Sequence, residues 1–150
     1  MYAILRTTHS YWAYFVLLLL VVAAGNALLG KIRGNTFEVK DLRLSLFGLI
    51  FSHIQLLIGL LLYFISPWFE QWSSLGVGGV MKSAEARLYL VEHPVTNILA
   101  IVLITLGWSL HKRQTESSKK FLRIGIFYSL GLVLLLSRIP WQAWLCLIQM

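Results

Sequence analysis

The chain of 150 residues is too apolar for an ordinary soluble domain. Hydrophobic residues make up 58% of it and charged residues 13%, whereas soluble domains contain about 45–50% apolar and about 25% charged residues. We therefore expect an all-α membrane protein in contact with the lipid bilayer, and neither nucleic-acid binding nor a large aqueous catalytic domain. A disulfide scaffold is excluded within one chain because Cys146 is the single cysteine. The net charge of +7 bears first on the orientation of the chain in the membrane, because lysine and arginine concentrate in cytoplasmic loops.

Four long apolar stretches follow one another along the chain. Since a membrane-spanning helix needs about 20 apolar residues, they predict transmembrane helices over about 9–30, 43–67, 88–111 and 121–138. Short connections favour a single domain over 1–150, an antiparallel up-down-up-down four-helix bundle. Pro94 lies in the first turns of the third stretch, where a missing backbone N–H costs little, so we expect the helix to continue through it.

The distribution of positive charge predicts the orientation. Nine of the thirteen lysines and arginines fall in the loops after the first and third stretches. By the positive-inside rule these loops face the cytoplasm and both termini lie outside it. The loop 71–86 and the uncharged tail 141–150 are then expected on the outer leaflet. The nine cations are Lys31, Arg33, Lys40, Arg43, Lys112, Arg113, Lys119, Lys120 and Arg123.

Small and polar residues recur at alternating three- and four-residue spacing on three of the stretches. Helices in lipid associate through close approach of small residues and through polar contacts, so these stripes predict the faces that pack in a left-handed bundle. The stripes are His9, Ala13, Val16, Leu20, Ala23, Ala27 and Gly30; Ser45, Gly48, Ser52, Gln55 and Gly59; and His93, Asn97, Ala100, Ile104, Gly107 and His111.

Two of these stripes carry a histidine at the same outer end. With a rise of about 1.5 Å per residue, His9 stands roughly 31 Å above Gly30 and His93 roughly 27 Å above His111. His53 is expected deeper, near the bilayer midplane, and His111 is expected to be a solvated residue at the cytoplasmic end. Because the first and third helices of such a bundle are diagonal, His9 and His93 can face each other.

Two facing imidazoles are the arrangement that a haem iron with two axial histidines requires. The alternative pair of His53 with His93 is disfavoured by the difference in depth. Arg138 is predicted level with His93, where it could pair with Glu92 or with a haem propionate, or extend to the headgroups. Glu92 lies about 100° around the helix from His93 and is expected to contact His9 instead.

Several segments resemble a family of small four-helix bacterial membrane proteins, common in Bacteroidota and catalogued as cytochrome b-like. The segments are His9-Ser10, 52–59 (SHIQLLIG), Val91-Glu92-His93-Pro94 and Ile139-Pro140-Trp141. The resemblance covers nearly the whole chain. It implies a bacterial inner membrane protein with a b-type haem and with His9, His53 and His93 as candidate histidines.

Three functions follow from these patterns. The first is a membrane electron-transfer protein that holds haem b between His9 and His93 and exchanges electrons with a quinone or a larger respiratory complex. The second is an accessory subunit of a larger membrane complex, without a cofactor. The third is a metal carrier or sensor that uses His9, His53 and His93 directly, which the difference in depth disfavours. No serine, cysteine or paired-carboxylate pattern indicates a hydrolase.

Overall fold

The computed structural model describes residues 1–146, which are helical over most of their length. The long helices are α1 (Tyr2–Ile32), α2 (Val39–Ile65), α6 (His93–His111) and α7 (Ser117–Ser137). α5 (Ala84–Arg87) and the π-helical turn η2 (Leu88–Glu92) run into α6, so Ala84–His111 forms one helix of 28 residues. Four helices are thus long and apolar enough to cross a membrane.

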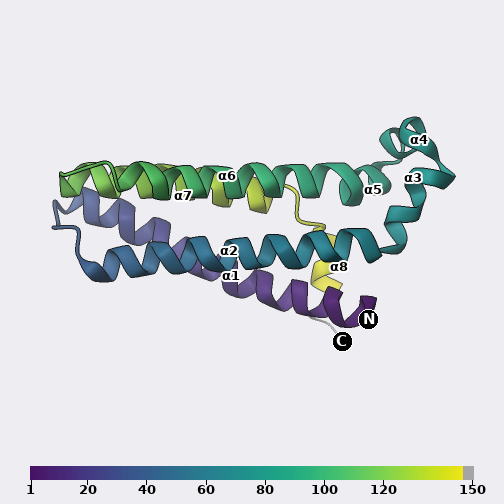
Figure 1. The fold of residues 1–150 in the computed structure, drawn as a ribbon, viewed down its shortest axis with the longest axis horizontal. Helices are drawn as coiled ribbons and strands as arrows, with labels where there is room; N and C mark the ends of the chain where they lie inside the picture. The colour runs from purple at the N-terminus through teal and green to yellow at the C-terminus, as the bar shows by residue number, and fades with distance from the viewer. Residues whose placement is uncertain (147–150) are drawn as a thin grey trace.

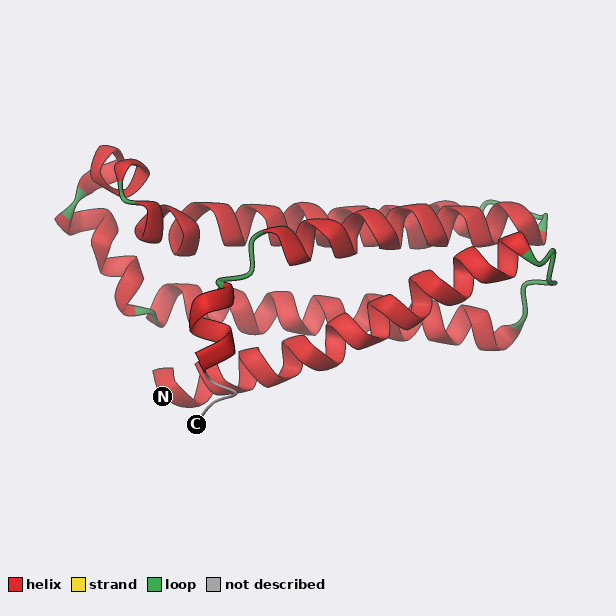
Figure 2. Ribbon diagram, turned by 180° about the vertical axis from the view of Figure 1, so that it is seen from behind, coloured by secondary structure: helices red, strands yellow, loops and turns green. Residues whose placement is uncertain are grey.

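The four long helices lie side by side along the long axis of the molecule (Figure 1). Short loops join α1 to α2 and α6 to α7 at one end, and both chain termini lie toward the other end. Between α2 and α5 come the short elements η1 (Pro67–Glu70), α3 (Gln71–Ser74) and α4 (Gly76–Lys82). After α7 the chain turns across the bundle and forms α8 (Trp141–Cys146) beside the first part of α1 (Figure 2).

The first and third long helices are diagonal partners, as expected. α1 packs against α2 and α7, and α6 packs against the same two helices. The side chains that meet between α1 and α6 therefore line the central axis of the bundle.

The buried faces follow the predicted small-residue stripes. Val16, Leu20, Ala23 and Ala27 are buried on α1, and Gly48 and Ser52 are buried on α2 together with Ser45. On α6 the buried positions are Ala100, Ile101, Ile104, Gly107, Trp108 and His111. A Cβ added at Gly107 would stand 2.6 Å from Cβ of Phe127 on α7. Glycine, alanine and serine let the helix backbones approach closely, which is how helices associate in lipid.

The helices extend beyond several predicted boundaries. α1 begins at Tyr2 rather than near residue 9, because no proline or glycine interrupts the polar turns before His9. α2 begins at Val39, where Glu38 and Asp41 form a reciprocal capping box. It ends at Ile65, since Ser66 is extended before Pro67. Apolar length marks the part suited to lipid, whereas caps and prolines set where a helix begins and ends.

The connection between α2 and α5 has a small core of its own. Val80, Ala86 and Leu90 are buried there, with Trp68 and Trp72 packed against them. In α8, Trp144 stacks on Tyr14 of α1 with ring centroids 4.1 Å apart. The part of the predicted tail beyond residue 146 lies outside the described residues. Both segments therefore pack at the end of the bundle at which the chain starts.

Candidate functional site

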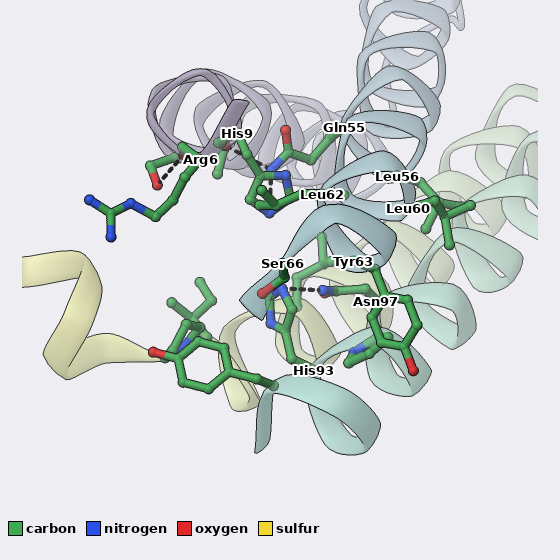
Figure 3. Close-up of a pocket in the computed structure, with 18 of the residues that line it drawn as sticks. Arg6, His9, Gln55, Leu56, Leu60, Leu62, Tyr63, Ser66, His93 and Asn97 are labelled. Carbon is green, nitrogen blue, oxygen red and sulfur yellow. Dashed lines mark hydrogen bonds between the residues drawn. The ribbon is translucent and has the colours of Figure 1, made fainter. Parts of the chain in front are cut away.

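A cavity of about 290 Å³ opens at the end of the bundle where the chain begins. Apolar side chains form most of its wall, and a few polar side chains from α1, α2 and α6 converge on it (Figure 3). The polar residues that line the cavity are Tyr2, Arg6, His9, Ser10, Ser52, Gln55, Tyr63, Ser66, Tyr89, His93 and Asn97. A largely apolar hollow with a few convergent polar groups is the usual form of a ligand site.

His9 and His93 face each other across this cavity. Their ring centroids are 6.3 Å apart and their planes are inclined by 77°. Both rings line the cavity wall and come from the diagonal helices α1 and α6. The predicted juxtaposition of these two histidines is therefore present.

The ring of His93 is held by two hydrogen bonds. Its Nδ1 lies 2.8 Å from the backbone oxygen of Arg138, and its Nε2 lies 2.9 Å from Nδ2 of Asn97. Since a carbonyl only accepts and an amide nitrogen only donates, Nδ1 carries the proton and Nε2 accepts. The Arg138 carbonyl thus fixes the tautomer in which Nε2 carries the electron pair, here engaged by Asn97, as backbone carbonyls do for histidines that bind metals.

The ring of His9 is less completely paired. Gln55 Nε2 donates to the backbone oxygen of His9 at 3.0 Å and lies 3.4 Å from its Nε2. Nδ1 of His9 is buried and has no hydrogen-bond partner within the described residues. A Cβ added at Gly59 would stand 3.0 Å from Cε1 of His9, so glycine at this position makes room for the ring. A buried and unpaired imidazole nitrogen is a costly feature unless a ligand satisfies it.

The turn before His93 is widened by the proline that follows it. Pro94 has no N–H and its ring crowds the carbonyl four residues earlier, which belongs to Leu90. The helix accommodates this through the π-helical turn η2, with His93 N bonded to the oxygen of Leu88. The oxygen of Leu90 accepts instead from the hydroxyl of Tyr63 at 3.3 Å. The helix thus passes through Pro94 without a break, which confirms that prediction.

Arg138 contacts the ring of His93 through its backbone oxygen and not through its side chain. Its guanidinium is half-exposed and lies 3.5 Å from Oε2 of Glu92. The other carboxylate oxygen of Glu92, Oε1, accepts from Arg87 Nε at 2.8 Å. The side chain of Arg138 is not in the cavity wall, whereas that of Arg6 is. Of the pairings considered for Arg138, the one with Glu92 is present. The expected contact of Glu92 with His9 is replaced by these two arginines.

The remaining two histidines lie away from the cavity. His53 bonds through Nδ1 to the oxygen of Leu49 at 2.8 Å, and its Nε2 is 3.4 Å from the hydroxyl of Thr105. His111 was expected to be solvated, and this is wrong, because it is only 2% exposed. Its ring lies between the rings of Phe37 and Trp108. The loop before α2 folds over the end of α6 and covers it, which no pattern within α6 could predict.

The separation of the two imidazoles and the volume of the cavity can be compared with what a haem requires. A metal–imidazole bond is about 2 Å long, so two imidazoles on one iron have centroids about 6 Å apart, and the observed separation is 6.3 Å. To offer an electron pair, His93 must release the hydrogen bond from Asn97, and His9 must release the contact of its Nε2 with Gln55. The cavity volume is close to the lower limit of about 300 Å³ for ligand pockets, so side chains at its mouth must move outward for so large a group. The spacing of the two rings suits a shared iron once these hydrogen bonds and the mouth of the cavity open.

Among residues 1–146, His9, His53 and His93 do not come together as three ligands for one metal ion. Within residues 1–146, no group of three or more histidine, cysteine, aspartate or glutamate side chains is placed to hold an ion. His53 does not join His9 and His93 at the cavity. The third sequence-based hypothesis therefore has no geometric support.

Sequence reasoning did not identify Arg6, Gln55 or Tyr63 as parts of the site. Arg6 lies three residues before His9 and Gln55 four residues before Gly59, so both share a helix face with a residue of interest. This spacing is the sequence signal by which Arg6 and Gln55 could have been found.

No family model, curated protein or solved structure matches the chain.

Proposed function

We propose that the chain is a membrane electron-transfer protein, or a subunit of one, in which His9 and His93 hold a b-type haem. The observation that carries this proposal is the pair of imidazoles 6.3 Å apart on diagonal helices. The resemblance to cytochrome b-like proteins supports it. Haem, when bound, would supply a one-electron redox centre.

The chain's own residues have separate roles in this proposal. His9 and His93 would hold the haem iron through two imidazole nitrogens, which would favour electron transfer over oxygen chemistry. The carbonyl of Arg138 holds the tautomer of His93. Gln55 holds the turn that carries His9 through its hydrogen bond to the backbone oxygen of His9. Arg6 at the cavity and Arg138 outside it are the cations available to carboxylates of a bound ligand.

We propose further that the four long helices cross the bacterial inner membrane up-down-up-down with both termini in the periplasm. Nine of thirteen cations belong to the end of the bundle at which α1 joins α2 and α6 joins α7. This end would face the cytoplasm. The histidine cavity then lies toward the periplasmic side, where a quinone in the bilayer or a larger respiratory complex could exchange electrons with it.

The absorption spectrum of the purified protein tests the function. After expression with sufficient haem, we expect a six-coordinate low-spin spectrum and one haem for each chain. A protein that is pure, helical and thermally cooperative but colourless would contradict the proposal. That result would favour an accessory subunit of a larger membrane complex.

A further inference from the structure

A second cavity, of about 300 Å³, lies at the opposite end of the bundle from His9 and His93, and His111 is among its lining residues. Its lining comes from the loop before α2, the first turn of α2, the end of α6 and the start of α7. These segments lie at the same end of the bundle (Figure 1). Phe37, Val39 and Leu42 provide apolar walls, while Lys112 and Lys120 bring two ammonium groups to its edge.

These two lysines are not neutralised by carboxylates. Lys112 Nζ lies 4.8 Å from the ring centroid of Trp108, and Lys120 Nζ lies 5.7 Å from that of Phe37. Neither forms an ion pair within residues 1–146, whereas Lys40 and Lys119 pair with glutamates. Each ammonium carries three N–H donors, so both lysines retain donors for an anion.

The surroundings favour an anion as well. This end of the bundle carries nine cations and three carboxylates. Glu38, which lines the cavity, is paired with Lys40 at 3.1 Å. Asp41 accepts from Asn26 and from the backbone N–H of Glu38, so it is also occupied. The local charge is therefore strongly positive.

The same cavity continues onto exposed apolar surface. Val39 is 61% exposed and Leu42 36% exposed at its rim. A ligand that satisfies both parts has a negatively charged head and an apolar tail. Basic pockets between helices at the cytoplasmic face of membrane proteins bind lipids of this kind.

We propose that this cavity binds the phosphate headgroup of an anionic phospholipid through Lys112 and Lys120, with its acyl chain over Val39 and Leu42. The proposal rests on the membrane placement proposed above and is independent of haem. Binding would also stabilise the fold locally. Phe37 joins the two sides of the cavity, since its N–H donates to Ser117 Oγ at 2.9 Å and its ring packs on Phe121 of α7.

Thermal unfolding of the full chain in a maltoside detergent tests the proposal. We expect phosphatidylglycerol to raise the unfolding temperature and phosphatidylcholine, which has no net charge, to have little effect. In the double variant Lys112→Gln/Lys120→Gln, affinity for phosphatidylglycerol should fall about thirtyfold, which is about fivefold for each lysine. Lys120→Gln alone should show the fivefold loss.

The double variant Arg113→Gln/Lys119→Gln is the matched control, because it removes two charges from the same end of the bundle, one in the α6–α7 loop and one in the first turn of α7, outside the cavity wall. It should keep most of the response. An equal loss in this control would mean that diffuse charge attracts the lipid, and the proposed site would be wrong. Equal stabilisation by inorganic phosphate, or by phosphatidylcholine, would also overturn it. The haem spectrum of the same samples reports separately on the proposed function.

Discussion

The hydroxyl of Tyr63 on α2 donates to the backbone oxygen of Leu90, the carbonyl that Pro94 leaves without its helical partner. The same hydroxyl accepts from the indole N–H of Trp72 at 3.0 Å. A residue of α2 and a residue of the connecting segment therefore stabilise the wide turn from which His93 projects.

Tyr63→Phe should lower the free energy of unfolding by about 1–2 kcal/mol, because it leaves a carbonyl and an indole N–H unpaired. If haem is bound, its spectrum should also shift, since the turn that positions His93 is released. Chemical unfolding in detergent and absorption spectra measure the two effects. Tyr11→Phe is the control, because Tyr11 is 66% exposed. Equal behaviour of the two variants would show that the Tyr63 bond has no positioning role.

The two cavity histidines should be individually necessary for the low-spin spectrum. We expect His9→Ala and His93→Ala each to abolish or alter it, because each removes an axial nitrogen. His53→Ala should retain the spectrum with a modest loss of stability, since its ring bonds to Leu49 and Thr105 instead. Absorption spectra of the folded variants decide this. Loss in His53→Ala with an unaffected His9→Ala would identify His53 with His93 as the axial pair.

Replacing each of two glycines by alanine should change the stability of the bundle in opposite directions. Gly107→Ala should destabilise the bundle by about 1–3 kcal/mol, because its Cβ would stand 2.6 Å from Cβ of Phe127. Gly25→Ala should stabilise α1 by up to about 1 kcal/mol, since nothing lies within 4 Å of its added Cβ. Unfolding temperatures in one detergent compare them. A tolerated Gly107→Ala would mean that α6 and α7 do not pack as closely as described.

Reporter fusions test the proposed orientation. Fusions after Lys40 and after Lys120 should both read as cytoplasmic, because these positions lie among the nine clustered cations. Fluorescent and alkaline phosphatase reporters respond oppositely on the two sides of the membrane. A periplasmic signal at either position would overturn the orientation and the assignment of the histidine cavity to the periplasmic side.

The sequence by itself determined the number of long helices and the faces on which they pack. Uninterrupted apolar stretches are long enough to span a bilayer only as helices. Small residues at helical spacing mark close approach, as at Gly48 and Gly107. Because short connections favour an up-down-up-down order in which the first and third helices are diagonal, the meeting of His9 with His93 could be predicted as well.

Only the tertiary structure decided what each histidine contacts. His93 bonds to the backbone of Arg138, 45 residues away in the chain, and His111 is covered by the loop that carries Phe37. Helical periodicity describes one face of one helix, whereas these contacts depend on how far a connecting segment folds back over its neighbours. The hydrogen bond of Tyr63 to Leu90 belongs to the same class, since it forms only when α2 packs beside the turn that Pro94 widens.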